Sequence, residues 1–390
     1  MDTRELRIVF VMDAIAGRNG VGTYFQDLAA QLTGRVASVA LISPQLGEPH
    51  PCQGASLPMP GDPTQRLFLP KLGEMTRIIL EHRPHVIVIP GPGLFSLAAS
   101  WIAARMGIPL CVTHQTDYNS LANLYWRGSF AKMAKGLLTL VNRWLFQRAA
   151  AVATISEPMQ QQLRLLGISH PHLVGTPLAP PFVQTSVIPV TGSVRRILFV
   201  GRLAAEKNIE HFLALSQQRP DLEFTIAGDG PLRDLVERQM AGQSNLRFLG
   251  WCPRETIVAA VDQHDLLILP SAVEAFGTVA LEAMARRRLV MVTPACGINQ
   301  WPALAEGLFV MRPDESLMES VARLEALPEL ARWRMAMLAE QAARAINEQC
   351  LGQWLQVLRI AARQRCVASS VLPSPAFALL RRRAMSGNNG

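Results

Sequence analysis

Short apolar runs alternate along the chain with longer stretches in which apolar residues recur every three or four positions. A continuous run such as DLLILP is typical of a strand buried on both faces of a parallel sheet, and the periodic stretches are typical of helices. A Pro- and Gly-rich stretch at 44–63 is predicted to be a loop. Strands are predicted at 7–14, 39–43, 86–93, 109–117, 149–155, 195–203, 222–230, 246–250, 265–271 and 289–295, with helices between them and over most of 315–364.

This alternation predicts an α/β fold of two doubly wound, Rossmann-like domains in tandem, each built on a parallel sheet. A stretch rich in Pro, Ser and Thr separates the two series of elements. The predicted division is a first domain at 1–178, a linker at 179–193, a second domain at 194–350, a helix at 351–370 that packs back toward the first domain, and a flexible basic tail at 371–390. A ligand is expected between the domains, at the carboxyl ends of the strands.

Composition narrows the class of protein only slightly. The 390 residues are 49% hydrophobic and 17% charged, with a formal net charge of +8. That charge is compatible with nucleic acid, anionic lipid or a phosphorylated ligand. The six cysteines are scattered and form no CxxC, which indicates reduced thiols in a cytosolic protein. The N-terminus is interpreted as a first strand without a signal peptide, and no run of about 18 apolar residues predicts a spanning helix.

Two loops at predicted strand ends carry residue types that suit a phosphate. Gly20 and Gly22 lie between the first strand and the first helix, where glycine permits close approach of a ligand to backbone amides. Arg202 and Lys207 follow the first strand of the second domain and suit a diphosphate. An ordinary tight turn and a solvated loop are the respective alternatives.

The stretch EAFGTVALEAM, 274–284, joins a buried strand to a helix and contains two glutamates. The first helical turn is predicted at 276–279, where free amides and the helix dipole favour an anion, and Gly277 allows close approach. Glu282 is predicted to lie one turn into the helix, on the face of Thr278. A favourable acid near a helix N-terminus would explain Glu274 but not Glu282.

The first domain offers His114 and Asp117 at the end of the strand 109–117, although an isolated histidine is often only packed. The segment 127–148 is basic and amphipathic and includes Lys132, Lys135 and Arg143. It suits an anionic membrane surface, and equally an outer helix with its basic face in solvent.

The motifs VGRLAAEKN, AGDGP, FLGW and LPSAVEAFGTVALEAMA occur in the order and spacing of the retaining glycosyltransferases of family GT4, which this sequence resembles over nearly its whole length. Glu274 and Glu282 match the family's E-x7-E signature. The resemblance implies the GT-B fold, with a sugar nucleotide mainly on the second domain and the acceptor mainly on the first.

The resemblance also implies roles for individual residues. Arg202 and Lys207 would bind the donor diphosphate, Glu274 the donor sugar and Glu282 the ribose. Further donor contacts would come from His114 near the sugar, the glycines Gly20 and Gly22, and the backbone at Phe276, Gly277, Thr278 and Val279. On this basis His114, Arg202, Lys207 and Glu274 are the predicted catalytic group.

No metal or cofactor is expected, because these cations and helix amides can stabilise the leaving diphosphate and the sequence contains no D-x-D. The motif THQTDYN with the basic segment after it resembles the glycolipid-forming branch, which makes mannosyl-phosphatidylinositol and sulfoquinovosyl- or glycosyl-diacylglycerol. The expected partners are therefore a UDP- or GDP-sugar, a lipid acceptor and the cytoplasmic face of an anionic membrane, with Asp117, Lys132, Lys135 and Arg143 on the acceptor side and no nucleic acid.

Other activities stay open at this point: a polysaccharide or soluble acceptor, a nucleotide-sugar epimerase, or a sugar-nucleotide-binding protein without activity. The chain departs from the family pattern at 175–177, 286–288 and 295–301, which affects the expected geometry around the donor.

Overall fold

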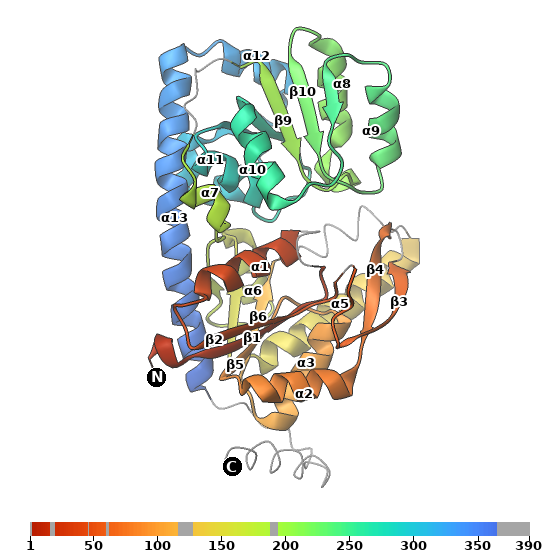
Figure 1. Ribbon diagram of the computed structural model, residues 1–390, viewed down its shortest axis with the longest axis vertical. Coiled ribbons are helices and arrows are strands. Elements are labelled where there is room, and N and C mark those ends of the chain that lie inside the picture. Colours follow the sequence, from red (N-terminus) through yellow and green to blue (C-terminus); the bar gives the residue numbers. More distant parts are fainter. Residues whose placement is uncertain are drawn as a thin grey trace.

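The computed structural model describes residues 2–15, 20–45, 47–59, 62–115, 128–187 and 194–364. Within these ranges the side chains of 59, 62–65, 128–132, 134 and 135 are not described. The structure contains two parallel six-stranded sheets, each with helices around it, one above the other in Figure 1.

The first sheet has the strand order β2-β1-β5-β6-β7-β8, and all its pairings are parallel. β1, β5, β6 and β7 are buried almost throughout, as their continuous apolar runs predict. The strands are β1 Arg7–Val11, β2 Ser38–Ile42, β5 Val86–Ile89, β6 Leu110–His114, β7 Ala151–Thr154 and β8 His172–Leu173. The helices are η1 Thr3–Glu5, α1 Gly20–Leu32, α2 Leu72–His82, α3 Leu94–Met106, α5 Gly128–Arg148 and α6 Glu157–Leu165.

The second sheet has the order β11-β10-β9-β12-β13-β14 and is again parallel. The strand order reverses beside β9, which is where doubly wound sheets bind ligands. The strands are β9 Arg196–Val200, β10 Glu223–Ala227, β11 Leu246–Phe248, β12 Leu266–Leu269, β13 Leu289–Val292 and β14 Phe309–Val310. The helices are η2 Ala205–Lys207, α8 Ile209–Gln218, α9 Arg233–Met240, α10 Arg254–Gln263, α11 Thr278–Ala285, η3 Gly297–Gln300, η4 Pro302–Gly307 and α12 Leu317–Glu325. The prediction of an α/β fold with two parallel-sheet domains is confirmed.

The prediction of a loop at 44–63 is wrong for its second half. β3 Gln53–Met59 and β4 Asp62–Pro70 form an antiparallel ribbon in which Leu57 pairs with Leu67. Side chains in β4 alternate, with Phe68 buried between the more exposed Leu67 and Leu69. This period of two belongs to a ribbon with one covered face, and the prolines and glycine in it concealed the pattern.

Two elements change the predicted division of the chain. Part of the predicted linker is helix α7, Pro180–Gln184, and its Phe182 is buried. Helix α13 runs without a break over Glu329–Arg363, so the boundary predicted at residue 350 falls inside it. α13 extends along both domains, and its last turns pack on the first (Figure 1).

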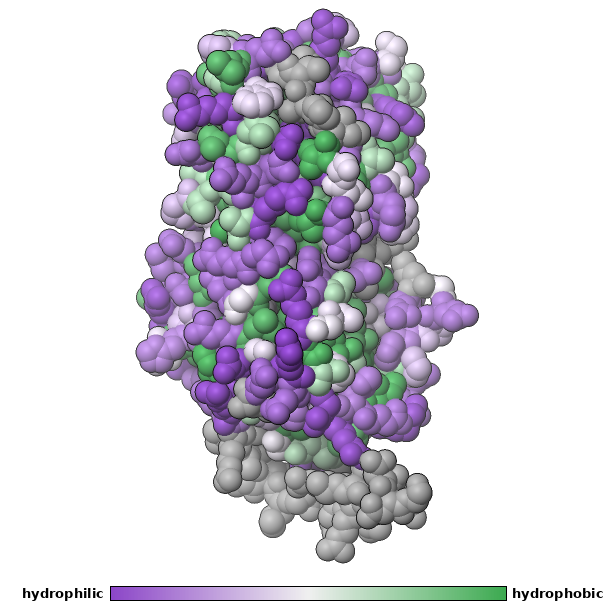
Figure 2. All heavy atoms as spheres, turned by 60° about the vertical axis from the view of Figure 1, so that its left-hand side comes forward, coloured by the Kyte–Doolittle hydropathy of each residue, from purple (hydrophilic) through white to green (hydrophobic). Residues whose placement is uncertain are grey.

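The end of α13 is anchored by a buried aromatic cluster. Trp354 is fully buried and donates its indole N–H to the Tyr24 hydroxyl at 2.7 Å. Tyr24 in turn donates to the carbonyl of Gly175 at 2.8 Å. Along the face that α13 crosses, hydrophilic side chains cover most of the surface and apolar ones are scattered (Figure 2). Among the described residues, no helix combines the length and the apolar character needed to cross a membrane.

Candidate active site

Two loops at the carboxyl edge of the second sheet bring the predicted cations and one glutamate together. Lys207 ends η2, after β9, and its Nζ donates to the carboxylate of Glu274, after β12. Both side chains are 18% exposed, so the pair is largely shielded from solvent but still accessible. Burial opposes the charge on Lys207, but Glu274 outweighs it, and the pKa of Lys207 is raised.

Arg202 lies in the same loop as Lys207. Its guanidinium is 3.5 Å from the carboxylate of the buried Glu206. The carbonyl of Glu206 accepts a hydrogen bond from the amide of Ala272 at 2.9 Å. The loop after β9 is thereby tied to the loop after β12, and the two cations have a fixed place relative to Glu274.

The backbone around Glu274 is held by the segment that follows β13. The amide of Gly297 donates to the Glu274 carbonyl at 2.9 Å, and the amide of Ile298 donates to the Phe276 carbonyl at 2.7 Å. A Cβ on Gly297 would lie only 1.9 Å from the Ala275 carbonyl oxygen, so only glycine fits at this position. Residues 295–301, which depart from the family pattern, therefore hold the backbone at Glu274 in place.

Helix α11 begins two residues later than predicted. It starts at Thr278, and Gly277 precedes it in the left-handed region with φ 97°. Phe276 is buried before the helix, and Thr278 and Val279 form its first turn. The first-turn amides of a helix have no carbonyl partner within it, so this end of α11 has the character of an anion site. Gly277 is required because an L side chain rarely adopts this φ and would come 3.1 Å from Cys296 Sγ.

Glu282 lies one turn into α11, as predicted, and is linked through Arg254 to the first domain. It is 2% exposed, and its Oε1 accepts from Arg254 Nη1 at 2.5 Å. The other end of the same guanidinium binds the carboxylate of Asp27, on α1 of the first domain. Neither Arg254 nor Asp27 was predicted, since nothing in a sequence pairs two residues 227 positions apart. The one local signal is an acid, Asp27, between the buried Phe25 and Leu28 of α1.

His114 is the last residue of β6 and is 7% exposed. Its Nε2 is 3.4 Å from Gln162 Oε1, and its ring stands edge-on to Phe146 with centroids 5.6 Å apart. Its carbonyl accepts from Thr154 Oγ1 at 2.9 Å. His114 is therefore at the predicted strand end, packed by neighbours in its own domain.

The carboxyl ends of both sheets meet near this histidine. Trp301 of the second domain donates its indole N–H to the carbonyl of Ile155 at 3.3 Å. Ile155 directly follows β7, the strand that pairs with β6. Trp301 also packs edge-on against Phe276, with ring centroids 5.9 Å apart. The loop that supports Glu274 is thus in contact with the strand ends of the first domain.

The remaining predicted residues are described only in part. Gly20 begins α1 and Gly22 is buried within it, but residues 16–19 before them lie outside the described residues. Asp117 also lies outside them, and Lys132 and Lys135 lie on α5 with side chains that are not described. Roles for these five positions stay predictions.

The matches to known protein families follow the two domains. Residues 19–179 match the family described as Glycosyl transferase 4-like domain, and residues 188–342 match Glycosyl transferases group 1. The chain belongs to the GT4 family of glycosyltransferases. The chain is accordingly a transferase enzyme, as the resemblance in the sequence implied.

Relatives of this glycosyltransferase are named for the transfer of different sugars. Alpha-D-kanosaminyltransferase of Streptomyces kanamyceticus is 25% identical over 66% of this chain and 75% of the relative. For 2-deoxystreptamine N-acetyl-D-glucosaminyltransferase of Streptomyces fradiae the identity is 29%, and the match spans 55% of each chain. Sulfoquinovosyl transferase SQD2 of Arabidopsis thaliana is 22% identical over 72% of this chain and 58% of its own.

Solved structures share the fold. Sucrose-phosphate synthase from Thermosynechococcus elongatus superimposes with a TM-score of 0.67 and 16% identity, over 90% of this chain and 98% of that one. Anabaena HepE, in complex with UDP and glucose, gives a TM-score of 0.62 and 16% identity over 88% of this chain and 98% of that one. The glycosyltransferase thus has the predicted GT-B fold.

Three successive arginines that depart from the family pattern bind the elements next to the end of α11. Arg286 is 1% exposed and binds the Asp262 carboxylate together with the carbonyls of Thr185 and Ser186 in the interdomain segment. Arg287 binds Glu340 on α13, and Arg288 donates to backbone carbonyls at the end of α10. These three side chains bind other groups of the protein, so we assign them no contact with the donor.

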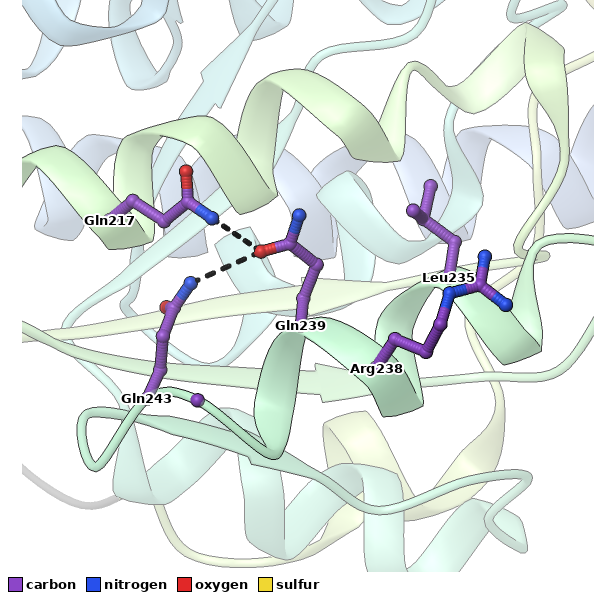
Figure 3. A pocket seen from close by; sticks show the side chains of 6 residues that line it. Gln217, Leu235, Arg238, Gln239 and Gln243 are labelled. Carbon is purple, nitrogen blue, oxygen red and sulfur yellow. Dashed lines mark hydrogen bonds between the residues drawn. The ribbon is translucent and has the colours of Figure 1, made fainter.

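A shallow pocket of about 440 Å³ between α8 and α9 lies away from this site. It is lined largely by glutamine amides, and the Gln239 amide oxygen accepts from both Gln217 and Gln243 (Figure 3). Most of the lining residues come from the carboxyl ends of the two helices and the turn after α9, which places them at the opposite edge of the sheet from Lys207. We assign it no part in the transfer reaction.

Proposed function

We propose that this glycosyltransferase moves a hexose-type sugar from a UDP- or GDP-sugar to a lipid acceptor at the cytoplasmic face of a membrane, with retention of the anomeric configuration. The acceptor hydroxyl attacks the anomeric carbon on the face that the diphosphate leaves. Its proton passes to the departing phosphate oxygen. The similarity to the GT4 family and the arrangement of the charged residues support this proposal.

The proposed roles of the donor-side residues follow from the charge that develops as the bond between sugar and diphosphate breaks. Breaking the bond between sugar and diphosphate develops positive charge on the sugar ring and negative charge on the leaving oxygen. Lys207 and Arg202 oppose the negative charge, and the first-turn amides of α11 add hydrogen bonds. Glu274 contacts the sugar, and the attack by the acceptor on the face that the diphosphate leaves gives Glu274 no role as nucleophile. We therefore expect transfer without a divalent metal, and activity that survives EDTA.

The acceptor class rests on one observation, an apolar stripe on the outside of α5. Met133, Leu137, Leu140 and Trp144 recur at intervals of four, three and four residues, and each is 40–66% exposed. This spacing puts them on one side of the helix. Arg143 is exposed beside them, and Arg148 stacks over the Trp144 ring at 4.4 Å. An apolar band with basic neighbours suits the interface of an anionic membrane.

A small soluble acceptor is the second candidate. It is supported by the names of two relatives, which act on 2-deoxystreptamine. The two candidates differ in what the α5 stripe does, since a soluble acceptor gives it no task.

The test offers a panel of sugar nucleotides together with diacylglycerol, phosphatidylinositol or aminocyclitol acceptors. Transfer to a lipid, with the same anomeric configuration in product and donor by NMR, is expected. Transfer only to the soluble acceptors would favour the second candidate, and an absence of both transfer and donor hydrolysis would refute the proposal.

Membrane binding is tested by co-sedimentation with phosphatidylcholine vesicles, with and without phosphatidylglycerol. We expect the variant Leu137→Gln/Leu140→Gln to lose at least tenfold in binding, since burying a leucine contributes about 1.5–3 kcal/mol. Leu165→Gln is the matched control, because Leu165 is 88% exposed on α6 and lies outside the stripe. Equal losses in both variants would contradict a membrane role for α5.

A further inference from the structure

A buried ion cluster joins the two domains beside the donor site. Arg254, the first residue of α10, lies between two carboxylates, Glu282 of α11 and Asp27 of α1. Asp27 and Glu282 are 5% and 2% exposed. The guanidinium also lies over the ring of Phe182, 5.2 Å from its centroid. Figure 1 shows α1 at the top of the first domain, below α10 and α11.

We propose that Arg254 and Asp27 are positioning residues, which hold Glu282 ready to accept a ribose hydroxyl of the donor and couple this contact to the first domain. The inference rests on the proposed function, because it takes the donor to be a nucleotide. It adds two residues that neither the family motif nor the sequence pattern contains.

Within the described part of the chain, the hydrogen bond to Glu282 uses one of its two carboxylate oxygens. Its Oε1 takes the hydrogen bond from Arg254 Nη1, and its Oε2 has no partner among the described residues. A carboxylate fixed through one oxygen offers the other in a constant direction, which lowers the cost of ordering it when a ligand binds. Burial raises the pKa of Glu282, and the positive charge of Arg254 opposes this rise.

The cluster holds one positive and two negative side chains, so its protonation depends on pH. Burial raises the pKa of Asp27 to about 7, and Arg254 only partly offsets this. Two arginines near α1 are paired with other groups. Arg35 on the following turn pairs with Glu348, and Arg344 of α13 binds Glu340 and a carbonyl of α7.

Ionised Asp27 strengthens the link between Arg254 and α1. A nucleotide contacted by both domains should therefore bind more tightly as the pH rises through about 7. Asparagine at position 27 resembles the protonated acid, so Asp27→Asn should match the wild type at pH 6 and bind about fivefold more weakly at pH 8.

The experiment measures dissociation constants of UDP and GDP, and of their 2′-deoxy and 3′-deoxy forms, by calorimetry on the full chain. The wild type should prefer one ribonucleotide over its deoxy form by about tenfold, as one hydrogen bond to a carboxylate implies. Glu282→Gln, Arg254→Met and Arg254→Lys should each reduce this preference to below about threefold. A purely structural role would lower thermal stability and leave the preference unchanged.

Arg219→Met is the matched control, because Arg219 also lies between two carboxylates, Asp221 and Glu325, at the opposite edge of the sheet. The Arg219→Met variant should keep both the preference for the ribonucleotide and the pH dependence of nucleotide binding. If the wild type binds no nucleotide diphosphate, the proposed function itself is wrong. If it binds one and the Arg254 variants keep the ribose preference, or Asp27→Asn keeps the pH dependence, the positioning role alone is overturned.

Discussion

Replacing Lys207 by Met removes the cation that contacts Glu274 while nearly preserving the length of the side chain. Each member of the pair is 18% exposed, so a diphosphate reaching this point would be partly shielded from water, and the charge would act strongly on it. Removing one preorganised donor from such a site costs about 3 kcal/mol of transition-state stabilisation. We therefore expect Lys207→Met to lower kcat by roughly two orders of magnitude.

The same substitution also leaves Glu274 without its partner. Breaking a fully buried pair costs about 3–5 kcal/mol, and the partial exposure here should reduce this to about 1–2 kcal/mol of unfolding free energy. The second substitution, Glu274→Gln, separates the two effects. In Lys207→Met/Glu274→Gln the isolated charge is gone, so stability should return toward that of the wild type while kcat stays low.

The assay combines initial rates at saturating donor with urea unfolding for the wild type, both single variants and the double variant. A folded Lys207→Met protein whose kcat lies within threefold of the wild type would refute the role of Lys207 at the leaving group. Recovery of kcat in the double variant would show that the loss came from the unpaired Glu274 instead.

Two further predictions concern the supports of the site. Trp354→Phe should lower the unfolding free energy by about 2 kcal/mol, because the buried Tyr24 hydroxyl loses a donor; an unchanged urea midpoint would contradict the anchoring of α13. Gly297→Ala should cost about 1–3 kcal/mol and at least tenfold in activity, because its Cβ would displace the Ala275 carbonyl next to Glu274. A melting temperature and activity like those of the wild type would exclude that crowding.

The parallel sheets could be predicted because their strands are continuous apolar runs, a pattern that scarcely depends on the rest of the fold. DLLILP at 265–270 illustrates this, since β12 occupies its centre and is buried at every residue. The ribbon β3–β4 escaped prediction for the opposite reason. One of its faces is exposed, with Leu57 in solvent, so alternation was the only signal, and prolines interrupt it.

The site was predictable to the extent that it is local. Lys207 and Glu274 meet because each follows a strand of the same sheet, and such loops share one edge. Arg254 and Asp27 could not be found this way, because they belong to different domains and come together only in the folded chain. Glu282 was identified from the resemblance to the family, and Arg254, which binds it, was identified only from the structure.

The positions where this chain departs from the GT4 pattern have a common location. Gly175 accepts the hydrogen bond from Tyr24 and faces α13, Arg286 binds the interdomain segment at Thr185 and Ser186, and Trp301 reaches the carbonyl of Ile155. The Trp301 contact joins the two domains, Arg286 binds the segment between them, and Gly175 lies against α13, which extends along both. Lys207 and Glu274 keep the family residues.

These departures lie where the two domains and the segment between them meet, and the charged residues Lys207 and Glu274 are unchanged. The departures should therefore alter how the domains move rather than the chemistry at the leaving group. The bridge from Glu282 through Arg254 to Asp27 belongs to the same junction. A domain closure that strengthens this bridge would also fix the ribose contact. In this glycosyltransferase, donor recognition and domain arrangement are therefore expected to change together, and variants at the junction should affect the KM for the donor before they affect kcat.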